Sequence, residues 1–544
     1  MYHMKYKDLR AAFVKHFVVF VFIFVMVLGI GLRLTNNVYW IWGNDAYDES
    51  RDMLVARHMV EYGDWVWRGP FAAGGQNILA NSPFYYYVIA AIWYLTRSPE
   101  MFMVVWALLM ASVIPIGYGV GSRLWDKSTG LWIALLFAVH PAFVGMSKLL
   151  SQVNLIPVWA LLMIYLLTNI RPWNIFHITI GLSVLFLGFH IHYGSMIMLT
   201  GFGVWICWIW WHHAAVKSVL GRIIYPIILA EYLFLLWVYV SYKVAPFDQF
   251  NFIEINLEGS HPNVLMMFDR AIKDIGFSLW PSAYGYRAIF VAVIGLLGCV
   301  VGTMTNIFTP RVRNFCFWGA VCLISGYISA SLYRGTLSVT YLYSLLPFYI
   351  IIFGLFMRHL FDKNRYIGAI VSVTILVYFW GFAVREMRPF TLESYYLKYE
   401  KIANAIVADY GKNNDVTQEA VPSFVLATLS SSPSLVYDAW GNGSSWYWLE
   451  KKYKKKLVNL SDTVTNFYPR VKDPRFFYVV CDHRESVDGA KICLKRFTGV
   501  RDYLSPSFDE IYHTSRFTVW KFYITSPVLS GVYNLAYDEL LHKK

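Results

Sequence analysis

The chain passes from the apolar run FVVFVFIFVMVLGIGL (residues 17–32) through a short connection into the acid-rich stretch NDAYDESRD (residues 44–52). A basic N-terminal stretch, MYHMKYKDLRAAFVKH, precedes the apolar run, as in a signal peptide, but no small-residue cleavage site follows it. We therefore expect an uncleaved membrane span over about residues 16–33. The acids that follow would then lie at a membrane surface.

The composition is that of a membrane protein that crosses the bilayer many times. The 544 residues are 57% hydrophobic, 18% aromatic and only 15% charged, and apolar runs of spanning length recur along the chain. A net charge of +13 would fit a nucleic-acid-binding protein. However, the basic residues sit mostly in short loops between apolar runs and form no stripe with base-stacking aromatics, so we expect no nucleic-acid partner.

Eleven apolar runs predict membrane-spanning helices. They cover about residues 16–33, 102–121, 130–147, 154–169, 174–190, 194–211, 223–241, 287–304, 315–333, 340–357 and 366–384. A further run, residues 84–96, would extend over roughly 20 Å of a hydrocarbon core of ~30 Å. We expect this segment to be a re-entrant or interfacial helix that does not cross.

The distribution of basic residues supports that choice. If residues 84–96 do not cross, the loops on the N-terminal side hold most of the basic residues, and the opposite short loops hold almost none beyond Lys148 and Arg334. The positive-inside rule then places the N-terminus in the cytoplasm. The first loop (34–101), a second long loop (242–286) and the C-terminal tail would lie on the extracytoplasmic face.

We predict two domains, a transmembrane module over residues 1–384 and an extracytoplasmic domain over residues 385–544. The tail alternates helix-like and strand-like patterns, which predicts an α/β or α+β fold. The helix-like segments are 395–410 and 446–456, and the strand-like ones are 423–429, 476–481 and 516–524. Outside the cytoplasm Cys481 and Cys493 can form a disulfide, whereas the other four cysteines lie in spans and are typical of packing.

The acids of the first loop are the candidate catalytic residues. Asn44 or Asp45 can cap a helix that begins near Ala46, and the positive N-terminus of that helix would by itself favour acids such as Asp52. The adjacent Asp48 and Glu49 also suit a general base that deprotonates a hydroxyl at the membrane surface. Carboxylates suit a divalent cation as well, so these two are the candidate metal ligands, although no CxxC or HExxH motif indicates zinc.

A transfer reaction with a phosphate leaving group also needs cations or hydrogen-bond donors. The outer ends of the predicted spans offer Lys148, His190, His192, Tyr193, Arg334 and Arg68. The alternatives are a snorkelling lysine and histidines that anchor the interface beside a tyrosine. Glu231 lies in the middle of a predicted span, where it is either functional or a structural hydrogen-bond partner between helices.

Several motifs of the first loop, in this order, resemble a known family. The loop contains Asp48-Glu49-Ser50-Arg51, then Gly63-Asp64-Trp65, and it closes with Ser82-Pro83-Phe84-Tyr85-Tyr86-Tyr87. This order resembles the first outer loop of the GT-C membrane glycosyltransferases, in the branch of protein O-mannosyltransferases and lipid A aminoarabinose transferases (ArnT-like). The motifs cover about residues 40–100, and the predicted topology is compatible with the family over the whole chain.

The resemblance implies transfer of a sugar from a polyprenyl-phosphate carrier to an acceptor on the outer face, usually with inversion. Asp48 would be the acidic residue that acts on the acceptor, with Glu49 as its partner. The aminoarabinose branch carries a lysine just before the proline at the end of the loop, where this chain has Asn81-Ser82. The phosphate would therefore be bound by Lys148, His192 and Arg334.

The sequence thus predicts a glycosyltransferase in the plasma or inner membrane, with a lipid, glycan or protein acceptor. The alternative is a transporter or flippase of a lipid-linked intermediate, which usually shows internal repeats and paired broken helices that are not found here. A non-catalytic scaffold would leave the acidic loop unexplained. The sequence names neither the sugar nor the acceptor.

Overall fold

The computed structural model describes part of the chain. The described residues are 6–35, 47–63, 65–66, 69, 82–169, 174–213, 223–233, 264–280, 286–332, 339–387, 405, 423–428, 458–459, 476–482, 508–513 and 517–523. The chain divides into two compact units, one made of Met1–Asn37 and His58–Arg388 and the other of Val38–Arg57 and Pro389–Lys544. Each unit is described by itself below.

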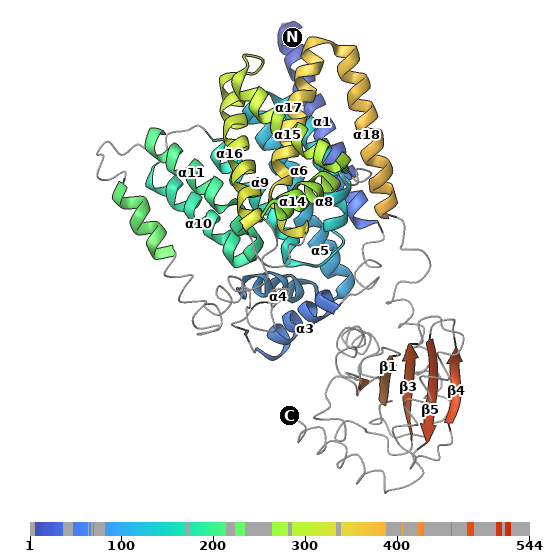
Figure 1. The fold of residues 1–544 in the computed structure, drawn as a ribbon. Coiled ribbons are helices and arrows are strands. Elements are labelled where there is room, and N and C mark those ends of the chain that lie inside the picture. The colour runs from blue at the N-terminus through green and yellow to red at the C-terminus, as the bar shows by residue number, and fades with distance from the viewer. Residues whose placement is uncertain are drawn as a thin grey trace, which may run out of the picture. The chain divides into compact units, whose positions relative to one another are not determined.

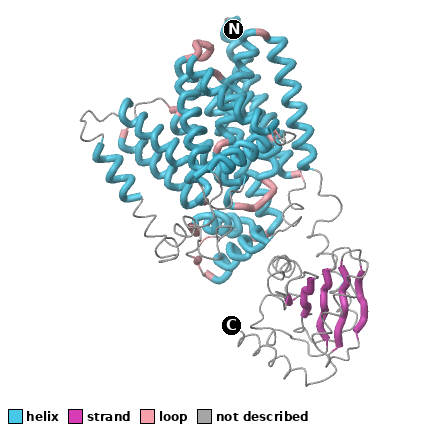
Figure 2. Tube along the Cα trace, in the orientation of Figure 1, coloured by secondary structure: helices cyan, strands magenta, loops and turns pink. Residues whose placement is uncertain are grey.

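The first unit is helical (Figures 1 and 2). Its helices are α1 (Tyr6–Leu34), α4 (Phe84–Thr96), α5 (Pro99–Ala111), α6 (Val113–Leu124), α7 (Lys127–Val139), α8 (Pro141–Met146), α9 (Leu155–Leu167), α10 (Ile175–Ile191), α11 (Met196–His213), Ile223–Leu233, α14 (Val264–Leu279), α15 (Tyr286–Met304), α16 (Pro310–Leu332), α17 (Leu346–Lys363) and α18 (Arg365–Met387). Short 3₁₀ helices are η1 (Gln152–Asn154), η2 (Tyr193–Ser195) and η3 (Val339–Ser344). A further helix, α3 (Tyr47–Tyr62), has residues in both units.

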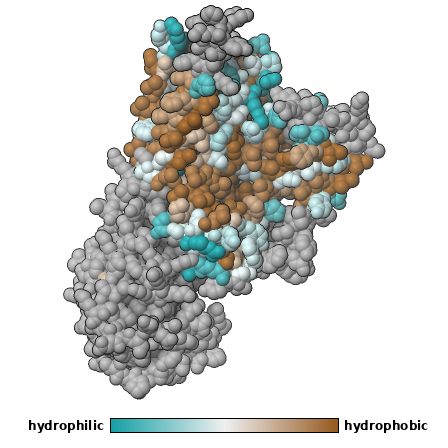
Figure 3. Space-filling view, turned by 180° about the vertical axis from the view of Figure 1, so that it is seen from behind, coloured by the Kyte–Doolittle hydropathy of each residue, from teal (hydrophilic) through white to brown (hydrophobic). Residues whose placement is uncertain are grey.

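Each predicted span overlaps one or two of these helices, and residues 234–241 of the span predicted over 223–241 lie outside the described residues. Five described segments are long and apolar enough to cross a bilayer: His16–Leu34, Glu100–Leu124, Arg287–Met304, Pro310–Ser331 and Arg365–Arg385. One face of the helical unit is apolar over most of its middle, with hydrophilic residues toward its ends (Figure 3). The protein is therefore an integral membrane protein, as predicted, while the number of crossings and their orientation stay predictions.

Two of the predicted spans are each divided into two α-helices. The run 102–121 forms α5 and α6, which meet at Ser112, and the run 130–147 forms α7 and α8, which meet at His140. The second break has a clear cause, because Pro141 has no N–H and disfavours helical geometry in the residue before it. His140 accordingly has extended backbone angles, φ −67° and ψ 123°.

Helix α4 has the bounds of the segment predicted not to cross. It lies across the end of the helical unit opposite the beginning of α1 (Figure 1) and packs on α5 and α10. Tyr85, Ile89 and Trp93 are buried along one face, while Leu95 is exposed.

The long loop 242–286 contains a helix that the sequence analysis missed. Helix α14 buries Met267, Ala271, Ile275 and Leu279, four positions spaced by four residues that make one stripe. This stripe belongs to a helix that packs on α15 and α16 and also contacts η3. The loop is therefore partly built into the helical unit.

The second unit contains a five-stranded mixed sheet. Its strands are β1 (Ser423–Thr428), β2 (Val458–Asn459), β3 (Phe476–Asp482), β4 (Phe508–His513) and β5 (Phe517–Tyr523), in the order β2-β1-β3-β5-β4. β1 is parallel to β2 and β3, with Val425 beside Val479, whereas β5 is antiparallel to β3 and β4. The three predicted strands are confirmed, and β2 and β4 were not predicted. The predicted helices 395–410 and 446–456 lie outside the described residues, apart from the helical residue 405.

Candidate functional site

Three short 3₁₀ helices lie where the predicted extracytoplasmic loops join the predicted spans. Helix η3 contacts both η1 and η2, and it also contacts α9, α11 and α14. Helix α4 contacts α10, whose end leads into η2. The fold thus gathers connections far apart in the sequence, and with them several of the predicted site residues.

The candidate base lies on α3. Asp48 and Glu49 fall in the first turn of this helix, which begins at Tyr47 as the sequence predicted, but their side chains lie outside the described part of the structure. Asp52 follows Asp48 by one helical turn, and its side chain is only 2% exposed. Because Asp52 is buried and lies beyond the first turn, attraction to the helix N-terminus does not account for it.

Lys148 is fully buried in the turn before η1. Its Nζ donates a hydrogen bond to the carbonyl oxygen of Thr35, 3.0 Å away, just beyond α1. Burial of this side chain makes the snorkelling alternative wrong. Lys148 therefore ties the loop before η1 to the end of α1.

Arg33, at the end of α1, is a buried cation that the sequence analysis did not single out. Its guanidinium donates to the carbonyl oxygens of Phe137 (2.9 Å) and Ala138 (3.0 Å), as well as to that of Gly29 in its own helix. The carbonyls at the end of a helix have no intrahelical partner, so Arg33 caps α7 just before its break.

The two predicted histidines have different surroundings. The Nδ1 atom of His190 lies 3.0 Å from the hydroxyl oxygen of Ser82, which joins the end of α10 to the residues before α4. The Nδ1 atom of His192 accepts a hydrogen bond from the N–H of Gly194, 2.8 Å away, and its ring lies 4.9 Å from that of Tyr341 in η3. Burial lowers the pKa of His192 to about 3, so this ring is neutral at pH 7.

The remaining predicted residues are less informative. Arg68 and Arg334 lie outside the described residues, as does the side chain of Tyr193, and the pairing of Cys481 with Cys493 is untested because Cys493 is also outside them. Glu231 is exposed on the helix Ile223–Leu233, which gives the transporter interpretation no support.

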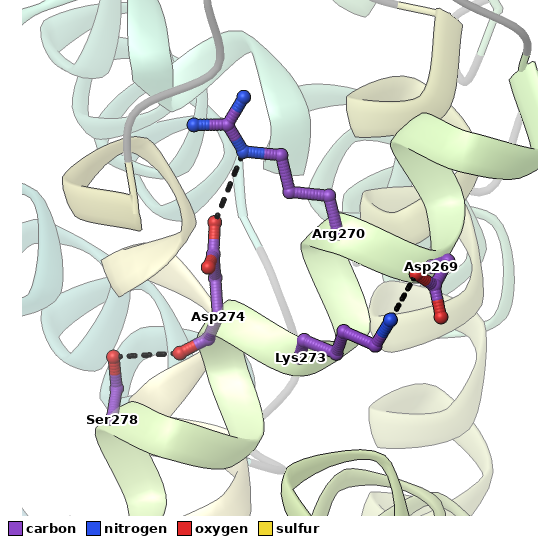
Figure 4. Close-up of polar contacts among 5 residues, drawn as sticks. All are labelled: Asp269, Arg270, Lys273, Asp274 and Ser278. Carbon is purple, nitrogen blue, oxygen red and sulfur yellow. Dashed lines mark hydrogen bonds and ion pairs between the residues drawn. The ribbon is translucent and has the colours of Figure 1, made fainter. Parts of the chain in front are cut away.

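A row of charges on α14 is the main feature that the sequence analysis missed (Figure 4). Lys273 pairs with Asp269, and the Nε atom of Arg270 lies 3.8 Å from a carboxylate oxygen of Asp274. The side chains of Arg270 and Lys273 are 53% and 36% exposed, so both cations are accessible. The sequence signal was present, because these charges lie opposite the apolar stripe of the helix.

The surroundings of Asp274 disfavour the ionised form of its carboxylate. Burial raises its pKa, and the charge of Arg270 partly offsets this by lowering it. Helix α14 contacts η3, so this carboxylate lies on a helix that is close to η3 in space.

The part of the chain that the structure describes contains no group of three or more His, Cys, Asp or Glu residues able to hold a metal ion. The metal ligands proposed from the sequence, Asp48 and Glu49, are not tested by this, because their side chains are not described.

Comparisons with known proteins identify the fold. No protein-family model and no curated protein sequence matches the chain. The structure is similar to that of ArnT from Cupriavidus metallidurans bound to undecaprenyl phosphate, with a TM-score of 0.51 and 12% identity over 94% of this chain and 98% of that one. An oligosaccharyltransferase from Archaeoglobus fulgidus, crystallised with Zn and sulfate, gives a TM-score of 0.46 and 12% identity over 86% of this chain and 68% of that one. Because the likeness to ArnT covers almost all of both chains, this protein has the fold of that structure, which is the fold that the resemblance in its first loop implied.

Proposed function

We propose that this protein is an integral-membrane glycosyltransferase that moves a sugar from a polyprenyl-phosphate donor to an acceptor hydroxyl on the extracytoplasmic face. The observation that carries the proposal is the gathering of η1, η2, η3 and the charged helix α14 around one end of a helical unit with the fold of ArnT. A lipid-linked donor fits a site on that face, because nucleotide sugars are made in the cytosol.

The proposed reaction is a single displacement. Asp48 takes the proton of the acceptor hydroxyl as its oxygen bonds to the anomeric carbon of the sugar. The bond between that carbon and the phosphate oxygen breaks, and its electron pair leaves with the polyprenyl phosphate. Attack opposite the leaving group inverts the anomeric carbon. Asp48 and Glu49 are the residues that would hold a divalent cation, whose charge would stabilise the leaving phosphate.

We assign the donor phosphate to Arg270 and Lys273 of α14, which the sequence analysis did not consider. Arginine binds phosphate through paired N–H donors, and a leaving phosphate needs such charge as the bond breaks. Both side chains are accessible and already hold carboxylates, which a phosphate can replace. Lys148, by contrast, is fully buried and donates a hydrogen bond to the carbonyl of Thr35, and His192 is buried and neutral. We therefore assign these two residues a structural role.

The exposed apolar residues of α14 suit the lipid part of such a donor. Leu265 and Met266, in the first turn, are 75% and 56% exposed, and Phe268 is exposed beside them. These side chains lie outside the buried stripe of α14, so they are available to contact acyl chains. A polyprenyl chain could then follow the apolar residues while its phosphate meets Arg270.

The base is tested by Asp48→Asn in proteoliposomes supplied with polyprenyl-phosphate sugars. We expect turnover to fall by at least ~10², the low end for acid–base groups. Glu61→Gln is the matched control, because Glu61 lies on the same helix and should be dispensable. Near-normal transfer by Asp48→Asn would refute the assignment of the base.

The phosphate site is tested by Arg270→Gln. Loss of a charge-assisted contact worth about 1.5–3 kcal/mol should raise the KM for the donor by about 10-fold or more, without a comparable change for the acceptor. The control is Arg365→Gln, which removes an exposed arginine from the beginning of α18. An unchanged donor KM in Arg270→Gln would show that α14 does not bind the phosphate.

A further inference from the structure

His140 lies at the break between α7 and α8 and is completely buried. Its Nδ1 atom accepts a hydrogen bond from the N–H of Ala142, 3.3 Å away, and so caps the first turn of α8. A neutral imidazole that accepts at Nδ1 carries its proton on Nε2. The donor side of the ring is therefore free to bind another element of the protein.

That donor faces the end of α14. The Nε2 atom of His140 lies 3.3 Å from the carbonyl oxygen of Leu279, the last residue of α14, 139 positions away in the sequence. The last carbonyls of a helix lack intrahelical partners, so His140 caps α14 as well as α8. The ring is in edge contact with those of Phe143 and Phe379, at 5.7 and 4.7 Å between centroids, which limits its rotation.

Other contacts hold the same end of α14. Trp280, the residue after the helix, stacks on Tyr378 of α18 with ring centroids 4.2 Å apart and an interplanar angle of 15°. Gly276 packs against the backbone of Ala288 in α15. At the opposite end of α14, Leu265 and Met266 are exposed. His140, Ala288 of α15 and Tyr378 of α18 thus contact the C-terminal end of α14, and Arg270 and Lys273 lie nearer its beginning.

The position of the C-terminal end of α14 therefore affects where the charges of this helix lie. With a rise of 1.5 Å per residue, Lys273 stands about 9 Å and Arg270 about 13 Å along the axis from Leu279. A tilt of about 10° at the anchored end would displace Arg270 by about 2 Å, enough to break a hydrogen bond.

We propose that His140 is a positioning residue, which caps the C-terminal end of α14 and thereby sets where Arg270 and Lys273 stand. The role rests on the proposed function, because those two cations are assigned there to the donor phosphate. His140 itself is completely buried, so it would act through α14 and not by contact with the substrate.

The test compares His140→Leu, which removes both ring nitrogens, with His140→Gln, which retains a side-chain N–H donor. Nitroxide labels at Leu265→Cys and Met304→Cys, both highly exposed, report the distance between the beginning of α14 and the end of α15 by pulsed electron paramagnetic resonance. The labels are placed in full-length protein whose accessible native cysteines are replaced by serine. Kinetics are measured in unlabelled His140 variants of the native sequence.

We expect His140→Leu to shift or broaden the distance distribution and to raise the donor KM by about 5-fold or more, with kcat changed less than 2-fold. His140→Gln should restore both readouts toward the wild type. A lower thermal stability with an unchanged distance and donor KM would overturn the proposal, and so would a raised donor KM with an unchanged distance. The distance measurement needs no substrate. Absence of transfer in the wild type would refute the proposed function, whereas an unmoved α14 in His140→Leu refutes the role of His140.

Discussion

Gly276 lies where the backbone of α14 is in close contact with that of α15, and Gly276→Ala tests whether this contact positions the helix. A Cβ atom added at Gly276 would lie 2.7 Å from the Cα atom of Ala288 and closer still to the carbonyl of that residue. Non-bonded carbon atoms prefer a separation of about 3.5–4.0 Å. The backbones must therefore separate by about 1 Å.

The size of the effect follows from what blocks the new methyl group. Overpacking a core costs typically about 1–3 kcal/mol, and the upper end applies here because a backbone cannot rotate away as a side chain can. Alanine is otherwise the better helix former by about 1 kcal/mol. We expect a net loss of about 1–2 kcal/mol of stability and a displaced α14.

The assay measures thermal stability in detergent and the donor KM for Gly276→Ala, with Gly203→Ala as the control. Gly203 lies in α11, and an added Cβ there would meet no atom within 4 Å. The control should keep or raise the Tm, whereas Gly276→Ala should lower it and raise the donor KM several-fold. If the two variants behave alike, the close approach of α14 to α15 is not what positions the helix.

Four further changes test the buried polar residues and one undescribed cation. Lys148→Met should lower the Tm, because the hydrogen bond to Thr35 is lost at a cost of about 1.5–3 kcal/mol. It should raise the donor KM less than Arg270→Gln does, and a larger increase would indicate that Lys148 binds the phosphate. Arg33→Met leaves the Phe137 and Ala138 carbonyls without their cap and should cost on the order of 3 kcal/mol, measured by Tm against Gly203→Ala; an unchanged Tm would contradict this role. Burial lowers the pKa of His192 to about 3, below the 6.5 of an unfolded histidine. The contribution of this ring to stability is therefore complete above pH 6.5 and is lost as the pH falls from 6.5 toward 3, by up to about 1.4 kcal/mol per pH unit. His192→Gln should make the profile of Tm against pH flatter in that window, and an equally steep profile would contradict the assignment. Arg334→Ala should weaken donor binding more than acceptor binding in equilibrium measurements, and equal effects would indicate a structural role.

Local patterns along the sequence were sufficient for most of the elements, although α14, β2 and β4 were not predicted. The apolar runs predicted helices at the right places because a helix in lipid must be apolar along its length and satisfy its own backbone hydrogen bonds. The start of α3 near Ala46 and the bounds of α4 followed from capping and run length. The strands β1, β3 and β5 followed from β-branched and aromatic runs. These properties depend on neighbours in the chain, so the sequence is enough to reveal them.

The candidate site depended on contacts between residues far apart in the chain. Arg33 and Lys148 both stand near the outer ends of predicted helices, yet each donates to carbonyls more than 100 positions away. The position of a cation in the sequence does not show whether it bonds to backbone carbonyls inside the protein or is available to bind a phosphate. Burial and partner identity favour a structural role, because both side chains are fully buried and donate to backbone carbonyls.

The stretch from residue 17 to residue 52 was enough by itself to predict that the chain enters a membrane and then presents acids at its surface. Only the tertiary structure placed α14 beside η3, joined the end of α14 to His140, and so pointed to Arg270 and Lys273 as the accessible cations. The physical reason is that hydrophobicity and helix propensity are properties of a local segment. The position of a charge relative to a substrate instead depends on how separate helices pack, which here is decided by a proline break, a glycine contact and a buried histidine.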